Sequence, residues 1–174
     1  MTLAENHSKE KKHIALLVNG EKVEADVESR ITLAEFLREE LRLTGTKIGC
    51  NRAECGSCTV ILDGEPVYSC SMLAVEAAGT EILTIEGLEN NASLHPLQDA
   101  FIEHDALQCG YCTPGMLMSL KALLDKNPRP RENDIRDAID GNFCRCGSYS
   151  NIINATFDAS EELLRKNRSN HGEK

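Results

Sequence analysis

Eight cysteines fall into two compact groups, and their spacing is the feature of this sequence that could do chemistry. The first group reads C-x4-C-x2-C, with a fourth cysteine after eleven further residues: Cys50, Cys55, Cys58 and Cys70. This is the plant-type [2Fe–2S] spacing, in which three thiolates share one loop and the fourth arrives from elsewhere. A zinc site more typically joins two short C-x2-C pairs, whereas only Cys55 and Cys58 form one here. We predict a [2Fe–2S] cluster for this group.

Glycines accompany the first group at Gly45, Gly49 and Gly56. A loop that turns its backbone N–H groups toward cluster sulfurs needs unusual dihedral angles and close backbone approach, and glycine allows both. The glycine content therefore favours the cluster over unrelated structural thiols.

The second group consists of two close pairs separated by 31 residues: Cys109 and Cys112, then Cys144 and Cys146. Spacing alone leaves zinc open for this group. Each pair precedes an expected helix start, at Thr113-Pro114 and at residues 149–151. Free N–H groups and the positive end of the helix dipole favour thiolate over thiol there. Two such helix ends facing each other would form a cradle for an anionic cluster.

Composition narrows the class of protein. The 174 residues carry a net charge of −9, and no run of Lys and Arg could form a phosphate-binding face, which argues against nucleic acid. The longest apolar run near the start, residues 14–18, is too short for a secretory core or a membrane span. We predict a cytoplasmic chain with no membrane partner, and an export route on a partner subunit stays open. Eight thiols in a reducing cytosol are better explained by metal than by four disulfides.

The first half reads as a small mixed sheet with one helix. Apolar residues alternate around two turn signals, Asn19-Gly20 and Asp63-Gly64, which predict hairpins. Thr32-Leu33-Ala34-Glu35 fits a capping box ahead of a helix. A further strand is expected over residues 81–85.

The pattern changes to helical spacing after residue 92. Four helices are expected, over residues 93–104, 113–125, 132–140 and 151–166. We predict two domains, 13–88 and 89–166, with mobile tails at 1–12 and 167–174.

Three runs of sequence resemble the iron–sulfur subunit of the xanthine oxidase type of molybdenum hydroxylases. They are residues 49–60 (GCNRAECGSCTV), 108–115 (QCGYCTPG) and 141–146 (GNFCRC). The three occur in the family's order and leave no cysteine unassigned. One departure is Gly147-Ser148-Tyr149, where many members have Thr-Gly-Tyr.

The resemblance implies an α+β fold: an N-terminal β-grasp, ferredoxin-like [2Fe–2S] domain followed by a C-terminal four-helix [2Fe–2S]-binding domain. It implies that electrons run from molybdopterin through the helical-domain cluster, then the ferredoxin-like cluster, to FAD. A large molybdopterin-binding subunit and a medium FAD-binding subunit would complete a heterotrimer or its dimer. By the same resemblance Gln108 and Cys146 would lie against the pterin.

No nucleophile–base pair, phosphate loop, or flavin or nicotinamide fingerprint occurs in the chain. We therefore expect an oxidoreductase subunit with no catalytic residues of its own, while a partner chain sets the substrate. Two alternatives stay open: a zinc-stapled interaction module with two S4 sites, and a free-standing two-cluster ferredoxin. The five histidines are interpreted as surface or capping residues.

Overall fold

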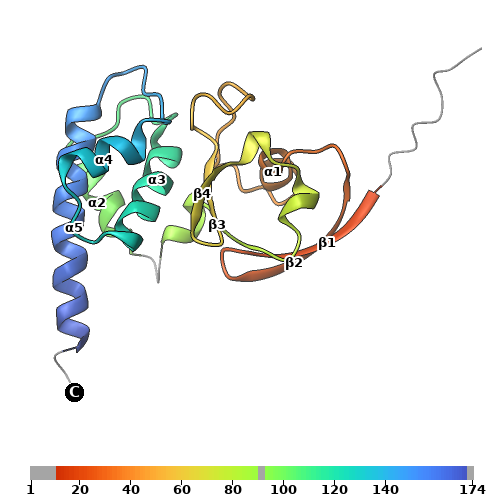
Figure 1. The fold of residues 1–174 in the computed structure, drawn as a ribbon, viewed down its shortest axis with the longest axis horizontal. Coiled ribbons are helices and arrows are strands. Elements are labelled where there is room, and N and C mark those ends of the chain that lie inside the picture. Colours follow the sequence, from red (N-terminus) through yellow and green to blue (C-terminus); the bar gives the residue numbers. More distant parts are fainter. Residues whose placement is uncertain (1–10, 90–92, 172–174) are drawn as a thin grey trace, which may run out of the picture.

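The computed structural model describes residues 11–89 and 93–171. Its N-terminal half is a mixed five-stranded sheet in the order β2-β1-β5-β3-β4 (Figure 1). The first two strands run antiparallel, β1 pairs in parallel with β5, and β5 pairs antiparallel with β3. The strands are β1 Lys11–Val18, β2 Glu21–Glu28, β3 Thr59–Leu62, β4 Glu65–Tyr68 and β5 Glu81–Leu83.

Both expected hairpins are confirmed. Asn19 and Gly20 have φ of 53° and 82°, and Asp63 and Gly64 have φ of 48° and 84°. Two successive positive φ values are the mark of a type I′ turn, whose twist matches that of the flanking strands. The second hairpin delivers Cys70, just after β4, toward the loop that carries the first three cysteines.

The expected helix after the first hairpin begins as predicted and then changes character. The Thr32 side chain accepts the Glu35 N–H while the Glu35 carboxylate accepts the Thr32 N–H, so the capping box is present. The α-helical part, α1, covers only Leu33–Glu35 and passes into a π-helix, η1 Phe36–Glu40. Both segments bury apolar side chains beneath the sheet.

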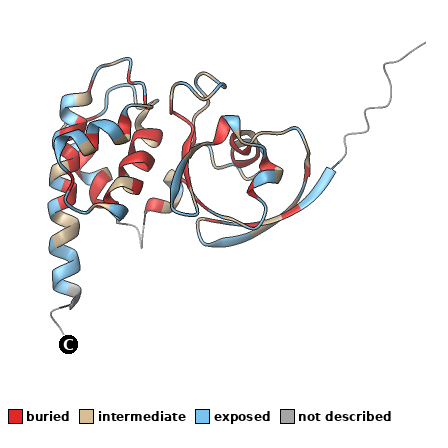
Figure 2. Cartoon of the chain, viewed as in Figure 1, coloured by how far each residue is buried: buried red, intermediate tan, exposed pale blue. Residues whose placement is uncertain are grey.

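The C-terminal half is helical, with α2 Pro96–Glu103, α3 Thr113–Lys126, α4 Glu132–Ile139 and α5 Tyr149–His171. Short 3-10 helices precede it: η2 Ser69–Ser71, η3 Ala74–Ala77 and η4 Ile85–Leu88. Buried residues line the inward faces of α3 and of the first half of α5 (Figure 2). Ile61 of β3 belongs to this helical core, and α3 packs against β3 and β4. The α+β fold class is therefore confirmed.

The ends differ from the expected tails. Lys11 and Lys12 belong to β1, and α5 continues to His171. The rest of the expected tails, residues 1–10 and 172–174, lies outside the described residues. None of the helices in residues 11–89 and 93–171 is long and apolar enough to cross a bilayer.

His95 provides the N-terminal cap of α2. Its ring nitrogen Nδ1 accepts the Leu97 N–H at 3.2 Å, and the Gln98 side chain accepts the His95 N–H at 2.9 Å. Desolvation, followed by the charge of Lys121, lowers the pKa of His95 to about 4. The neutral ring, which is the form that can accept a hydrogen bond, is therefore the form that the fold holds.

The low pKa of His95 predicts a loss of stability at acid pH. Because the pKa falls from 6.5 to about 4 on folding, the unfolded chain binds the extra proton between these values. We expect the free energy of unfolding to drop by about 1–3 kcal/mol as pH falls from 7 to 4. His95→Asn keeps an oxygen acceptor at the cap and should remove this part of the pH dependence. Denaturant unfolding of both proteins at a series of pH values measures this. The same dependence of the free energy of unfolding on pH in the wild type and in His95→Asn would contradict the prediction.

Candidate metal centres

The loop that carries the first three cysteines turns backbone N–H groups toward thiol sulfurs. Glu54 and Cys55 donate to Cys50 Sγ at 3.3 and 3.4 Å, and Ala53 donates to Cys70 Sγ at 3.5 Å. The loop can do this because Ala53 and Gly56 adopt φ of 59° and 66°, angles that turn successive N–H groups into one concavity. Such a concavity favours anionic sulfur.

The pKa values of the first group follow from these contacts. Burial acts to raise the pKa of Cys50, but the backbone N–H donors outweigh it and lower the pKa to about 7. Burial raises the pKa of Cys58 to about 12, with further contributions from Cys70. One thiol is thus prepared as a thiolate, while another needs the positive charge of a metal to lose its proton.

Gly45 has a different role from the one predicted. A Cβ there would overlap Ile85 and the Glu86 side chain, whose carboxylate accepts the Gly45 N–H at 2.7 Å. This glycine therefore permits close packing against η4. A Cβ on Gly49, by contrast, would lie 2.8 Å from Cys55 Sγ, so Gly49 leaves room at the thiols.

The cysteines of the second group lie close in sequence to the starts of α3 at Thr113 and α5 at Tyr149. Burial acts to raise the pKa of Cys144, but the Ser148 N–H, the Cys112 side chain and other backbone donors outweigh it and lower the pKa. Cys112 departs from the expectation that helix starts favour thiolates. It is the N-cap residue of α3, yet burial and its hydrogen bond to Cys144 raise its pKa to about 12.

The thiols approach one another in pairs. The side chain of Cys55 acts on the pKa of Cys50, that of Cys70 on the pKa of Cys58 and that of Cys144 on the pKa of Cys112. In the described part of the chain, no three Cys, His, Asp or Glu side chains converge as they would around one ion. A two-iron cluster takes two thiolates on each iron, and pairs of thiols with N–H donors match that arrangement.

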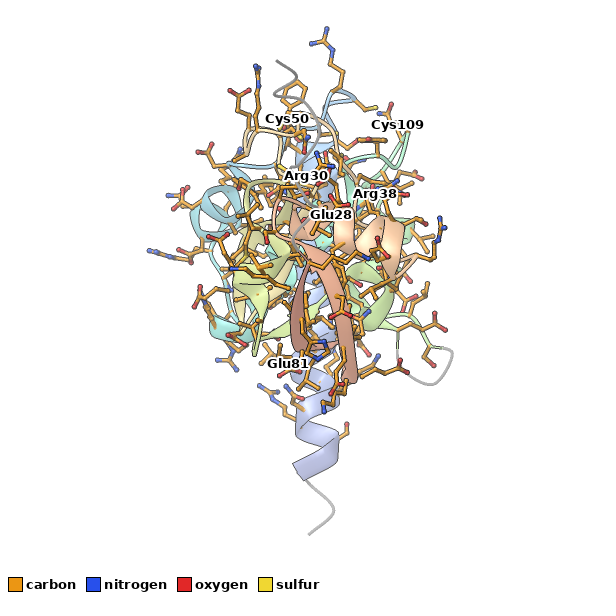
Figure 3. The ribbon with its side chains drawn as sticks, turned by 90° about the vertical axis from the view of Figure 1, so that its right-hand side faces the viewer. Glu28, Arg30, Arg38, Cys50, Glu81 and Cys109 are labelled. Carbon is orange, nitrogen blue, oxygen red and sulfur yellow. The ribbon has the colours of Figure 1, made fainter. Side chains whose placement is uncertain are left out.

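The two groups face each other across a cavity of about 250 Å³. Its lining includes Cys50 and Cys55 from the first group and Cys109 and Cys112 from the second. Figure 3 shows Cys50 and Cys109 at the same end of the molecule. The Phe143 N–H donates to the Cys55 carbonyl at 3.0 Å. One hydrogen bond therefore connects a cysteine of the first group to the residue that precedes Cys144.

Buried Asn142 fastens the two halves together beside the cysteines. Its side-chain NH2 donates to the Gly56 carbonyl at 2.9 Å, and its side-chain oxygen accepts from Ser119 Oγ at 2.8 Å. The Tyr111 hydroxyl adds a bond to the Ile48 carbonyl at 2.8 Å. Sequence reasoning missed Asn142, because nothing in its neighbourhood along the chain indicates a partner 86 residues away.

Gln108 and Cys109 are exposed, and Cys146 is partly exposed. Two large apolar side chains at this end of the molecule are also exposed: Tyr111 is 48% and Phe143 55% exposed. The second group therefore reaches the surface at Cys109, whereas Cys144 of the same group and Cys58 and Cys70 of the first are buried.

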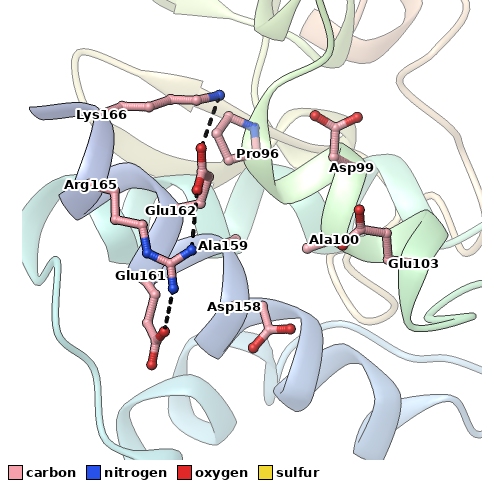
Figure 4. Close-up of a pocket in the computed structure, with 10 residues that line it drawn as sticks. All are labelled: Pro96, Asp99, Ala100, Glu103, Asp158, Ala159, Glu161, Glu162, Arg165 and Lys166. Carbon is pink, nitrogen blue, oxygen red and sulfur yellow. Dashed lines mark hydrogen bonds and ion pairs between the residues drawn. The ribbon is translucent and has the colours of Figure 1, made fainter. Parts of the chain in front are cut away.

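A separate groove of about 380 Å³ lies between α2 and α5 and contains no cysteine. Arg165 pairs with Glu161 and Glu162, and Lys166 pairs with Glu162 (Figure 4). These ion pairs lie on an exposed helix face, so the groove is interpreted as solvated surface.

Two family models match adjoining parts of the chain. Residues 16–84 match the model described as "2Fe-2S iron-sulfur cluster binding domain", and residues 84–157 match "[2Fe-2S] binding domain". The chain is 52% identical to caffeine dehydrogenase subunit gamma of Pseudomonas sp., over 82% of this chain and 87% of that protein. It is 46% identical to the nicotine 6-hydroxylase small subunit of Paenarthrobacter nicotinovorans, over 86% and 90% of the two chains.

Solved structures of two oxidoreductases contain the same fold. A chain of quinoline 2-oxidoreductase from Pseudomonas putida superposes with a TM-score of 0.87 and 46% identity, over 90% of this chain and 98% of that one. Aldehyde oxidoreductase from Desulfovibrio gigas gives a TM-score of 0.85 and 40% identity, over 89% of this chain but 17% of that longer one.

Proposed function

The chain belongs to the iron–sulfur subunits of molybdenum hydroxylases, and we propose that its eight cysteines hold the two [2Fe–2S] clusters through which electrons pass. Its function is electron transfer within an oxidoreductase complex. A [2Fe–2S] cluster supplies one-electron chemistry, which divides a two-electron oxidation into single steps. The chain itself positions, insulates and connects the clusters.

The ligands of the ferredoxin-like cluster are Cys50, Cys55, Cys58 and Cys70. Their contacts support two thiolates on each iron, one pair from Cys50 and Cys55 and the other from Cys58 and Cys70. The N–H groups of Ala53, Glu54 and Cys55 would stabilise the extra charge of the reduced cluster.

The ligands of the helical-domain cluster are Cys109, Cys112, Cys144 and Cys146. The contact of Cys112 with Cys144 supports one pair, which leaves Cys109 and Cys146 as the other. We assign the two clusters to domains 13–88 and 89–166, because strands give way to helices between η4 and α2.

The observation that carries this function is the link between the two cysteine groups. From Cys55 the path crosses one hydrogen bond to the Phe143 N–H and continues along the backbone to Cys144. Asn142 holds both loops in place, and the cavity beside the link is lined partly by Tyr111 and Phe143. Electrons can thus pass between the two sites without a conformational change.

The relatives named as subunits of multi-subunit dehydrogenases support a large molybdopterin-binding partner and a medium FAD-binding partner, in a heterotrimer or its dimer. We propose that the exposed end at Gln108, Cys109 and Cys146 faces the molybdopterin subunit, with Gln108 and Cys146 nearest the pterin. The ferredoxin-like cluster would then pass electrons on to FAD.

Purification of the native complex tests this function. We expect larger molybdenum- and flavin-containing chains to co-purify, with acid-labile sulfide and two distinct spin-half EPR signals after reduction. A colourless protein with stoichiometric zinc and no labile sulfide would contradict cluster binding. A brown, monomeric protein without partners would instead indicate a free-standing ferredoxin.

A further inference from the structure

Ser148 carries a buried hydroxyl with no partner. The residue is 6% exposed. Among the buried side-chain oxygen and nitrogen atoms in the described part of the chain, its Oγ alone makes no hydrogen bond. Burial of an unpaired hydroxyl is unfavourable, and nearly all such groups in folded proteins have a partner.

Helix capping does not account for this serine. Ser148 directly precedes α5, which begins at Tyr149, and a serine there would ordinarily accept an N–H from the first helical turn. No such bond forms. The hydroxyl therefore stays free although the helix offers it donors.

The surroundings of Ser148 point to a cluster sulfur. The Gly147 N–H donates to the Cys144 carbonyl at 3.2 Å, and the N–H of Ser148 lies close enough to the Cys144 thiol to lower its pKa. The hydroxyl is attached to a backbone that already contacts one proposed cluster ligand. Sulfur atoms are the hydrogen-bond acceptors that a cluster would bring to this buried position.

We propose that the Ser148 hydroxyl donates a hydrogen bond to a sulfur of the helical-domain cluster and raises the reduction potential of that cluster. This inference rests on the cluster site proposed above. Reduction adds negative charge to the cluster, so a donor aimed at its sulfur stabilises the reduced state more than the oxidised state. Ser148 is a positioning and tuning residue and transfers no electron itself.

Redox titration of the native complex followed by EPR tests the proposal. Ser148→Ala is expected to make the helical-domain cluster harder to reduce, by about tenfold in its reduction equilibrium, which is ~59 mV for one electron. The potential of the ferredoxin-like cluster should not change. Ser148→Thr keeps a hydroxyl and should restore most of the shift. Ser150→Ala is the matched control, because Ser150 lies two residues on and is exposed.

Resonance Raman spectra of the wild-type complex give a readout that does not depend on a variant folding. A hydroxyl donor to sulfur predicts a shift of an Fe–S stretching band in D2O that Ser148→Ala loses. Unchanged potentials in a Ser148→Ala complex that retains both clusters would overturn the proposal, as would equal shifts in both clusters. Lower thermal stability with unchanged potentials would mark a purely structural serine. Absence of iron from the wild-type complex would instead overturn the cluster assignment itself.

Discussion

Replacement of Cys109 by serine is expected to remove or alter one of the two EPR signals of the reduced complex while the other signal persists. Cys109 is exposed and belongs to the group at the start of α3 and α5, so its loss removes one ligand from the helical-domain cluster alone. If that cluster is lost, iron and labile sulfide should fall to about half. Electron transfer from substrate to FAD should stop, because the proposed path from molybdopterin to FAD runs through this cluster.

The reciprocal variant, Cys55→Ser, serves as the matched control. Cys55→Ser should remove or alter the EPR signal of the ferredoxin-like cluster and leave the signal of the helical-domain cluster unchanged. The backbone bond from Phe143 to the Cys55 carbonyl does not involve the Cys55 side chain, so contact between the halves should persist. Loss of both signals from either variant, in a protein that is still folded, would contradict two independent four-cysteine sites.

Short-range features of the sequence predicted most of the fold. The Asn19-Gly20 and Asp63-Gly64 pairs predicted hairpins because a type I′ turn is encoded by the turn residues themselves. The capping box at Thr32 and Glu35 was equally local. The continuation of α1 as a π-helix was not predicted, since apolar residues spaced for an α-helix also fit the buried face of η1.

Features that depend on long-range contacts could not be predicted in the same way. Ser148 at the start of α5 looks like an ordinary cap, and only the three-dimensional structure shows its hydroxyl without a partner. The raised pKa of Cys112 is another case, because burial by distant segments overrides the local helix start. Local sequence thus indicates which residues could bind a cluster, whereas packing between the halves determines their charge and connection.

The contact between Tyr68 and Gly141 predicts a large effect from adding one methyl group. The Tyr68 hydroxyl, from β4, donates to the Gly141 carbonyl at 3.2 Å. A Cβ on residue 141 would overlap that hydroxyl oxygen, while the ring carbon Cζ lies at 3.1 Å. We expect Gly141→Ala to lower the free energy of unfolding by about 1–3 kcal/mol. It should also slow electron transfer between the clusters, because residue 141 directly precedes Asn142 and Phe143.

A double-mutant cycle separates this clash from a general loss of stability. In the wild type, Tyr68→Phe removes a hydrogen bond and should cost about 0.5–1.5 kcal/mol. In the Gly141→Ala background the same change removes the overlapping oxygen and should recover part of the lost stability, so the effects of the two substitutions will not add. Denaturant unfolding of the four proteins measures the coupling. Strictly additive effects would show that residue 141 is not held against Tyr68 and would contradict the predicted clash.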